Sequence, residues 1–304
     1  MDIAEGSPPL PLVILGTPDG TVRALDGRDG STRWQFAAGS THPFFSFALA
    51  TDRGLVYAAA GDGLVSALRL DDGSLLWQQQ LPYVGPPVGP RFDMAVRVVA
   101  GSGAVAVSMR RQDTWRTDAC SITVLEGATG VQRWVFTPRS LAWIRPLRAL
   151  GPLTVYFPDP VGATLLAVDA TGVYVTSSRQ PGGKAPICVT AVRDLRQGRL
   201  RWRTRRAAAQ IQFPSMSSRM SLTVAGGVVY TLGARLSALA ASNGWLRWQR
   251  PAPPAPPASR QGVLVANAAV VCAACGSLFA TYRARDGAAL WQLDGHHESH
   301  LPHG

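Results

Sequence analysis

The chain has 304 residues, 46% of them hydrophobic, and a formal net charge of +11 at pH 7. This composition allows a large buried core, built as one all-β domain or as two domains. No transmembrane segment is predicted, because no run approaches the roughly 18 consecutive apolar residues of a spanning helix. All basic residues except Lys184 are arginine. The charge favours an anionic partner, such as an acidic protein or a membrane surface, and no specific nucleic-acid partner is predicted.

The N-terminus does not read as a signal peptide. Residues 1–10 carry Asp2 and Glu5 where a signal peptide has basic residues, and prolines interrupt the apolar segment that follows. We predict an N-terminal tail or strand stub over 1–10 and, for the chain as written, a cytoplasmic location. A periplasmic or extracellular location follows if the chain is a truncated form of an exported protein.

The stretch from Val56 to Gln80 reads as three short strands. Its apolar runs are separated by turns at Gly61-Asp62-Gly63 and Asp71-Asp72-Gly73, the pattern of half-buried strands joined by tight turns. Such a small meander cannot bury both of its faces alone, so it requires neighbours of the same kind.

A Gly-x-x-x-Trp element supplies those neighbours, because it recurs six times along the chain. Glycine permits the positive-φ turn that leads into each closing strand, and the indole can fill the space between adjacent sheets. Both residues are predicted to be structural. The twelve residues are Gly30 and Trp34, Gly73 and Trp77, Gly130 and Trp134, Gly198 and Trp202, Gly244 and Trp248, Gly287 and Trp291.

The repeat predicts an all-β fold, a β-propeller of about six four-stranded blades. Successive motif tryptophans lie 43 to 68 residues apart, and four-stranded units at such a period are typical of propeller blades. The first repeat begins directly at its second strand, so the first blade is expected to be incomplete. We predict one propeller domain over 11–294, with an insertion over 137–162.

The pattern Ala-Leu-x-x-x-x-Gly-x-x-x-Trp, as in SALRLDDGSLLWQ and RALDGRDGSTRWQ, resembles the tryptophan-docking repeat of the pyrroloquinoline-quinone (PQQ) type β-propellers. The resemblance runs from about Pro11 to Asp294. That superfamily includes quinoprotein alcohol dehydrogenases and a non-enzymatic branch, to which the outer-membrane assembly lipoprotein of the β-barrel machinery belongs. The repeat therefore implies the fold and leaves the chemistry open.

The cysteines argue against quinone binding. The resemblance implies that an enzyme of this superfamily cradles PQQ under a disulfide of adjacent cysteines, and no two cysteines are adjacent here. Cys272 and Cys275 would lie on opposite faces of one strand. We expect Cys120, Cys188, Cys272 and Cys275 all to be reduced and buried.

Histidines gather at the end of the chain, in the tail over 295–304. Imidazoles at these spacings could collect Zn²⁺ or Ni²⁺, although a solvated terminus explains the same residues. They are weak metal candidates: His296, His297, His300 and His303.

One strand carries an unusual run of arginines, in the segment RLRWRTRR. The side chains alternate with Leu200, Trp202 and Thr204, so a strand would present the guanidinium groups on one face. The charges can protect an outer strand from edge pairing or form an interaction rim for an acidic partner or anionic lipid. The four rim candidates are Arg199, Arg201, Arg203 and Arg205.

No arrangement of residues in the sequence supports catalysis. No Ser/His/Asp or Cys/His nucleophile pattern is visible, and no cofactor is predicted. The sequence therefore predicts a non-catalytic propeller that binds another protein as an interaction scaffold. The alternative is a PQQ-dependent dehydrogenase-like or small-ligand-binding propeller.

Overall fold

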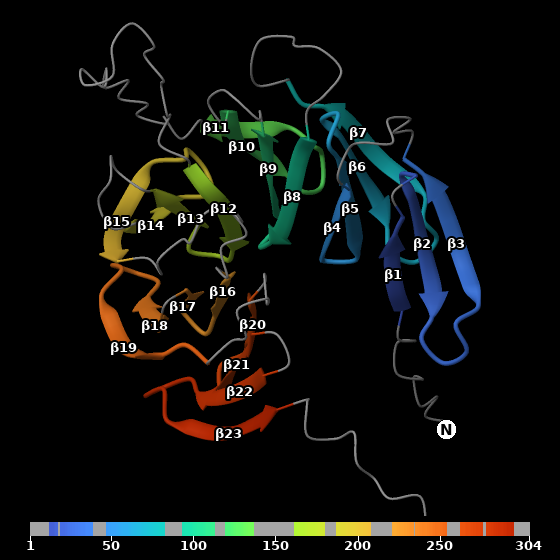
Figure 1. The fold of residues 1–304 in the computed structure, drawn as a ribbon. Coiled ribbons are helices and arrows are strands. Elements are labelled where there is room, and N and C mark those ends of the chain that lie inside the picture. The colour runs from blue at the N-terminus through green and yellow to red at the C-terminus, as the bar shows by residue number, and fades with distance from the viewer. Residues whose placement is uncertain are drawn as a thin grey trace, which may run out of the picture. The chain divides into compact units, whose positions relative to one another are not determined.

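The computed structural model of the protein is built from strands. It describes residues 12–17, 19–38, 47–82, 93–112, 119–136, 161–179, 187–207, 221–233, 235–253, 262–275 and 278–294. The chain divides into two compact units, which we call unit 1 (Met1–Pro138) and unit 2 (Arg139–Gly304). Each unit contains three antiparallel sheets (Figure 1).

Unit 1 begins with a three-stranded sheet of β1 (Leu12–Gly16), β2 (Thr21–Asp26) and β3 (Thr32–Ala37). The second sheet contains β4 (Phe47–Asp52), β5 (Leu55–Ala60), β6 (Leu64–Arg69) and β7 (Leu75–Gln80). The third contains β8 (Asp93–Gly101), β9 (Ala104–Gln112), β10 (Ala119–Glu126) and β11 (Gln132–Phe136). In each sheet the strands pair in chain order.

Unit 2 has three four-stranded sheets, and their strands also pair in chain order. The fourth sheet of the chain contains β12 (Val161–Val168), β13 (Val173–Arg179), β14 (Ile187–Arg193) and β15 (Leu200–Ala207). The fifth contains β16 (Ser221–Ala225), β17 (Val228–Leu232), β18 (Arg235–Ala240) and β19 (Leu246–Pro251). The sixth contains β20 (Gly262–Ala266), β21 (Val270–Cys275), β22 (Leu278–Arg283) and β23 (Ala289–Asp294).

The turn before each last strand has one geometry in all six sheets. The motif glycine donates its backbone N–H to the carbonyl four residues earlier, as Gly73 does to Arg69 at 3.0 Å. The six motif glycines have φ between 68° and 75°, the region that residues with a Cβ avoid. A register shift follows in each outer pair, as between Ala67 and Leu68. The glycine thus lets a tight turn feed a bulged outer strand.

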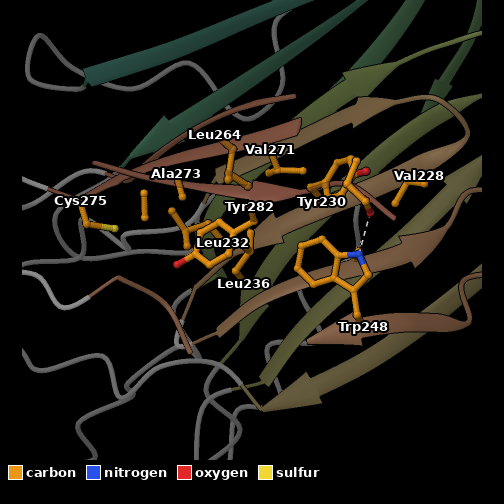
Figure 2. Packing of buried hydrophobic residues seen from close by; sticks show 13 residues of the cluster. Val228, Tyr230, Leu232, Leu236, Trp248, Leu264, Val271, Ala273, Cys275 and Tyr282 are labelled. Atoms are coloured by element: carbon orange, nitrogen blue, oxygen red, sulfur yellow. Dashed lines mark hydrogen bonds between the residues drawn. The ribbon is translucent and has the colours of Figure 1, made fainter. Parts of the chain in front are cut away.

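Neighbouring sheets within a unit share their apolar cores. In unit 2 the fifth and sixth sheets bury one cluster that includes Tyr230, Trp248, Val271 and Tyr282 (Figure 2). In unit 1 the second and third sheets bury a cluster around Tyr57 and residues of β8 to β10. Sheets of this size cannot bury two faces alone, so face-to-face packing is needed to cover their apolar side chains.

The predicted fold class is confirmed. The described residues form an all-β protein of six antiparallel blades, and the first blade has three strands. The tails over 1–10 and 295–304, and most of the insertion over 137–162, lie outside the described ranges. The single domain over 11–294 remains a prediction. Within the ranges that the structure describes, no helix is long and apolar enough to cross a membrane.

Candidate functional site

Four motif tryptophans dock onto the next blade of the same unit, and we call each such contact a tryptophan dock. In unit 1 the indole N–H of Trp34 donates to the carbonyl of Leu70 at 2.9 Å, and that of Trp77 donates to Gly127 at 2.8 Å. The acceptor lies three residues before the motif glycine of the following blade in both cases. The polar end of a largely buried ring is therefore satisfied.

Unit 2 repeats the same dock twice. Trp202 donates to the carbonyl of Ala241 and Trp248 to that of Ala284, each at 2.8 Å. Figure 2 shows the indole of Trp248 inside the apolar cluster, beside Tyr230. The centroids of these two rings lie 5.9 Å apart at 46°, a tilted aromatic contact of the favourable kind.

The motif glycine is also the surface on which the preceding tryptophan lies. A Cβ at Gly73 would lie 2.5 Å from the Trp34 ring, and one at Gly244 would lie 2.5 Å from the Trp202 ring. Gly130 and Gly287 stand in the same relation to Trp77 and Trp248. Glycine is thus required twice, for its positive φ and for its missing side chain. The positive φ was predicted from the sequence, whereas the close approach of the indole was not.

The motif residues Trp291 and Gly30 have surroundings that differ from those of the residues in a tryptophan dock. Trp134 is 9% exposed, whereas Trp291 in the last blade is 55% exposed. A Cβ at Gly30 would meet no atom within 4 Å. A motif residue is therefore buried in one blade and exposed in another, and the repeat pattern alone does not predict which.

A tyrosine stands in register with the docking tryptophan in three blades. Tyr57 is opposite Ala67, which is opposite Trp77, and the rings of Tyr57 and Trp77 lie 6.1 Å apart. Burial raises the pKa of Tyr57 to about 12, and the charges of Asp52 and Glu126 act in the same direction. These tyrosines are therefore neutral packing groups at physiological pH. The corresponding residues in the fourth and fifth blades are Tyr174 and Tyr230.

The cysteine prediction is wrong for Cys272. Cys275 is buried, but the Cys272 thiol is exposed and lies 3.4 Å from the Thr281 hydroxyl. Cys272 stands in register with Thr281 and the exposed Trp291, so it lies on the face of β21 that is least covered. The side chains of Cys120 and Cys188 lie outside the part that the structure describes.

The predicted arginine rim is solvent-exposed. Arg201, Arg203 and Arg205 are exposed along β15, while Trp202 and Thr204 on the other face are partly buried. Arg199 is exposed too, but it precedes the strand and donates its backbone N–H to Asp194. The structure therefore presents three guanidinium groups in strand register, with Arg199 in the adjoining turn.

The predicted metal candidates His296, His297, His300 and His303 lie outside the described ranges. Among the residues that are described, no three His, Cys, Asp or Glu side chains come together as a potential metal site.

These docks and sheets define a class of protein, the PQQ-like β-propeller repeat proteins. The sequence model of the family described as outer membrane protein assembly factor BamB matches residues 18–190 and 187–303. Because these matches cover most of the chain, the protein belongs to that family. No curated protein sequence matches the chain.

Solved structures show the same fold at low sequence identity. BamB from Moraxella catarrhalis is 15% identical with a TM-score of 0.55, over 92% of this chain and 72% of that one. A europium-containing methanol dehydrogenase is 13% identical with a TM-score of 0.53, over 94% and 69%. The quinohemoprotein alcohol dehydrogenase from Comamonas testosteroni is 12% identical with a TM-score of 0.51, over 93% and 65%. At such identities the likeness concerns the fold alone.

Proposed function

We propose that this protein is a non-catalytic interaction scaffold, as the assembly-factor description of its family suggests. Four of the motif tryptophans, with the glycines on which they lie, are occupied in packing one blade on the next within each unit. They hold the outer strands and turns in a fixed geometry, which is the property that a binding platform needs.

One observation carries this proposal, namely the exposed apolar side chains beside the motif turns. Trp245 is 75% exposed and Val131 is 64% exposed, and each directly follows a motif glycine. Tryptophan and arginine are enriched among the residues that dominate protein–protein binding. Each of these exposed apolar groups lies two residues before an outer-strand arginine, Arg247 or Arg133, and this combination supports a role for each turn in binding another protein.

Site-specific cross-linking in cells tests the proposal. A photo-crosslinking amino acid replaces Trp245 or Val131 in the full-length protein, and the same amino acid at Arg28 serves as an exposed control. We expect a partner protein, identified by mass spectrometry, to be cross-linked at position 245, at position 131 or at both. The control at position 28 should not capture that protein.

A cofactor assay provides the opposing outcome. The purified protein is incubated with PQQ and Ca²⁺, and dye-linked alcohol oxidation is measured. We expect no turnover. Quinone-dependent oxidation, together with a lack of any captured protein, would replace the scaffold by the dehydrogenase-like alternative.

A further inference from the structure

The positive charge of the chain is concentrated in unit 2. Residues 1–138 contain 11 Arg against 13 Asp and Glu, a balance of −2, whereas residues 139–304 contain 19 Arg and Lys against 6 Asp and Glu, a balance of +13. The two balances add to the +11 of the whole chain. An anionic partner is therefore attracted to unit 2.

In the first and third blades of unit 1 the arginine before the motif tryptophan has a carboxylate partner. Arg33 donates through Nε to Asp26 at 3.1 Å, and Arg133 donates through Nε to Glu126 at 2.9 Å. Each acid is the residue whose carbonyl accepts the N–H of the motif glycine. The outer-strand arginine of these two blades is thus neutralised within its own blade.

In the fourth blade the corresponding acid is Asp194, and its carboxylate is already occupied. It accepts backbone N–H groups from Arg196 at 3.0 Å, Gln197 at 2.7 Å and Arg199 at 2.7 Å. Burial raises the pKa of Asp194, but these N–H donors and the nearby charge of Arg201 together lower it by more, so the net pKa lies below its ordinary value. Both carboxylate oxygens thus accept backbone N–H groups of the turn, and within the described part of the chain Arg201 acts on Asp194 through its charge without an ion pair at contact distance.

The same lack of a partner extends along β15 and into the fifth blade. Arg203 and Arg205 are exposed, and they too have no ion pair with a described carboxylate. In the fifth blade Ala240 occupies the acid position, and Arg247 is exposed. The guanidinium groups of these outer strands are therefore exposed and available to a ligand, and only the Arg201 charge also acts on a carboxylate of its own blade.

β15 is also the last strand of its sheet, so one of its edges has no strand partner among the described residues. Its arginines recur at every second residue, about 7 Å apart. The opposite face of β15 carries Trp202, which packs on Gly244 next to the 75% exposed Trp245. An added strand at this edge would thus meet arginines on one face and an exposed indole near the other.

We propose that the edge of β15 binds an extended protein segment in which acidic and apolar residues alternate, as a fifth strand of the fourth blade. This deepens the scaffold proposal and rests on it. Carboxylates at every second residue pair with Arg201, Arg203 and Arg205 across the strands. The backbone of the segment completes the open edge of the sheet, and its apolar residues lie toward Trp245. The open edge favours a peptide over a nucleic acid, whose backbone does not complete a β-ladder.

Calorimetry with a synthetic peptide tests this proposal on the full-length protein. The probe is a capped peptide of about ten residues that alternates Glu with Thr and Val, and a second peptide has the same composition with its Glu residues contiguous. We expect the alternating peptide to bind more tightly. Replacing Arg201, Arg203 and Arg205 together by Gln should raise its Kd by about 10- to 100-fold, since an exposed pair contributes about 2- to 5-fold.

The matched control is the triple replacement of Arg23, Arg28 and Arg69 by Gln, which removes three exposed charges from unit 1. It should change the Kd by less than about 2-fold. Equal effects of the two triples, equal binding of the two peptides, or no peptide binding would each overturn the proposal. Tighter binding of a single-stranded oligonucleotide that the β15 triple abolishes would overturn it as well. Cross-linked capture at position 245 would remain in these cases, so the scaffold proposal would stand separately.

Discussion

Unit 1 and unit 2 use the same tryptophan docks but carry different charge. Each unit has two docks in which an indole N–H reaches the following blade. The arginine beside the motif tryptophan is ion-paired in the first and third blades, whereas in the fourth it has no ion pair with a carboxylate that the structure describes. The contacts that hold a blade in place are therefore shared by the two units, whereas the charge that an outer strand presents to solvent differs between them.

Removing a docking tryptophan should have the largest effect, and it should be equal in the two units. Trp34→Ala and Trp248→Ala each delete a ring that is 7–8% exposed, which costs about 3–5 kcal/mol of unfolding free energy. Chemical denaturation monitored by circular dichroism measures the loss. Trp291→Ala, at a position that is 55% exposed, is the control and should cost much less. A large difference between Trp34 and Trp248 would show that the docks are not equivalent.

Adding a methyl group to the glycine side of the dock should have the next largest effect. Gly73→Ala and Gly244→Ala place a Cβ about 2.5 Å from the indole of Trp34 or Trp202, so overpacking of roughly 1–3 kcal/mol adds to a positive-φ cost of about 1–2 kcal/mol.

Gly30→Ala separates these two costs. Gly30 has φ of 72°, close to the 71° of Gly73, but its Cβ position is open. This variant should therefore lose only the backbone part. Equal melting temperatures for Gly30→Ala and Gly73→Ala would contradict the assigned contact.

Acid should destabilise the protein through the aspartates of its turns, which include Asp194 and Asp286 in unit 2 and several in unit 1. A backbone N–H from Arg28 and the Arg33 guanidinium hold the pKa of Asp26 below its ordinary value of 3.8, and turn contacts lower the pKa of Asp19, Asp29 and Asp72 likewise. Because the folded-state values are depressed, their stabilisation is present above pH 3.8 and is lost as pH falls through them.

The melting temperature should therefore be nearly constant from about pH 5 to pH 8 and should fall steeply below about pH 4. Asp26→Asn should melt at a lower temperature than the wild type at neutral pH, and the two should converge in acid. A constant difference between them at all pH values would exclude the assigned pKa shift.

Removing an outer-strand arginine should have the smallest effect and should differ between the units. Arg133→Gln breaks the ion pair with Glu126 and should cost about 0.2–1 kcal/mol. Arg247→Gln has no carboxylate at the corresponding Ala240 position, so stability should be unchanged. Urea denaturation at low and high salt measures both, and high salt should remove the difference. An equal loss at both positions would contradict the contrast between the units.

The fold could be predicted from the sequence because the motif is local. The turn needs glycine at positive φ and the outer strand needs an indole four residues later, so both constraints fall within five residues. The partner of each tryptophan could not be predicted in this way. Leu70 is 36 residues beyond Trp34, and Gly127 is 50 residues beyond Trp77, so the contact emerges only when two blades pack.

The charged surface could be predicted only in part. The alternation over Arg201, Arg203 and Arg205 gives their common face, because strand period fixes it. The role of Asp194 could not be predicted, because its carboxylate accepts three backbone N–H groups of the turn and forms no contact ion pair with Arg201 among the described residues. The exposure of Cys272 could not be predicted for a similar reason. Burial of a side chain in β21 depends on what covers each face of the strand, and the apolar run VVCAAC does not contain that information.

The tryptophan dock has a consequence for how such a chain changes its number of blades. Gly73 and the Leu70 carbonyl receive Trp34, while Trp77 of the same repeat reaches Gly127 of the next one. One repeat therefore encodes both the receiving and the donating half of the contact. A duplication of that genetic segment would arrive with both halves already compatible, so a blade can be gained or lost in evolution without inventing a new interface.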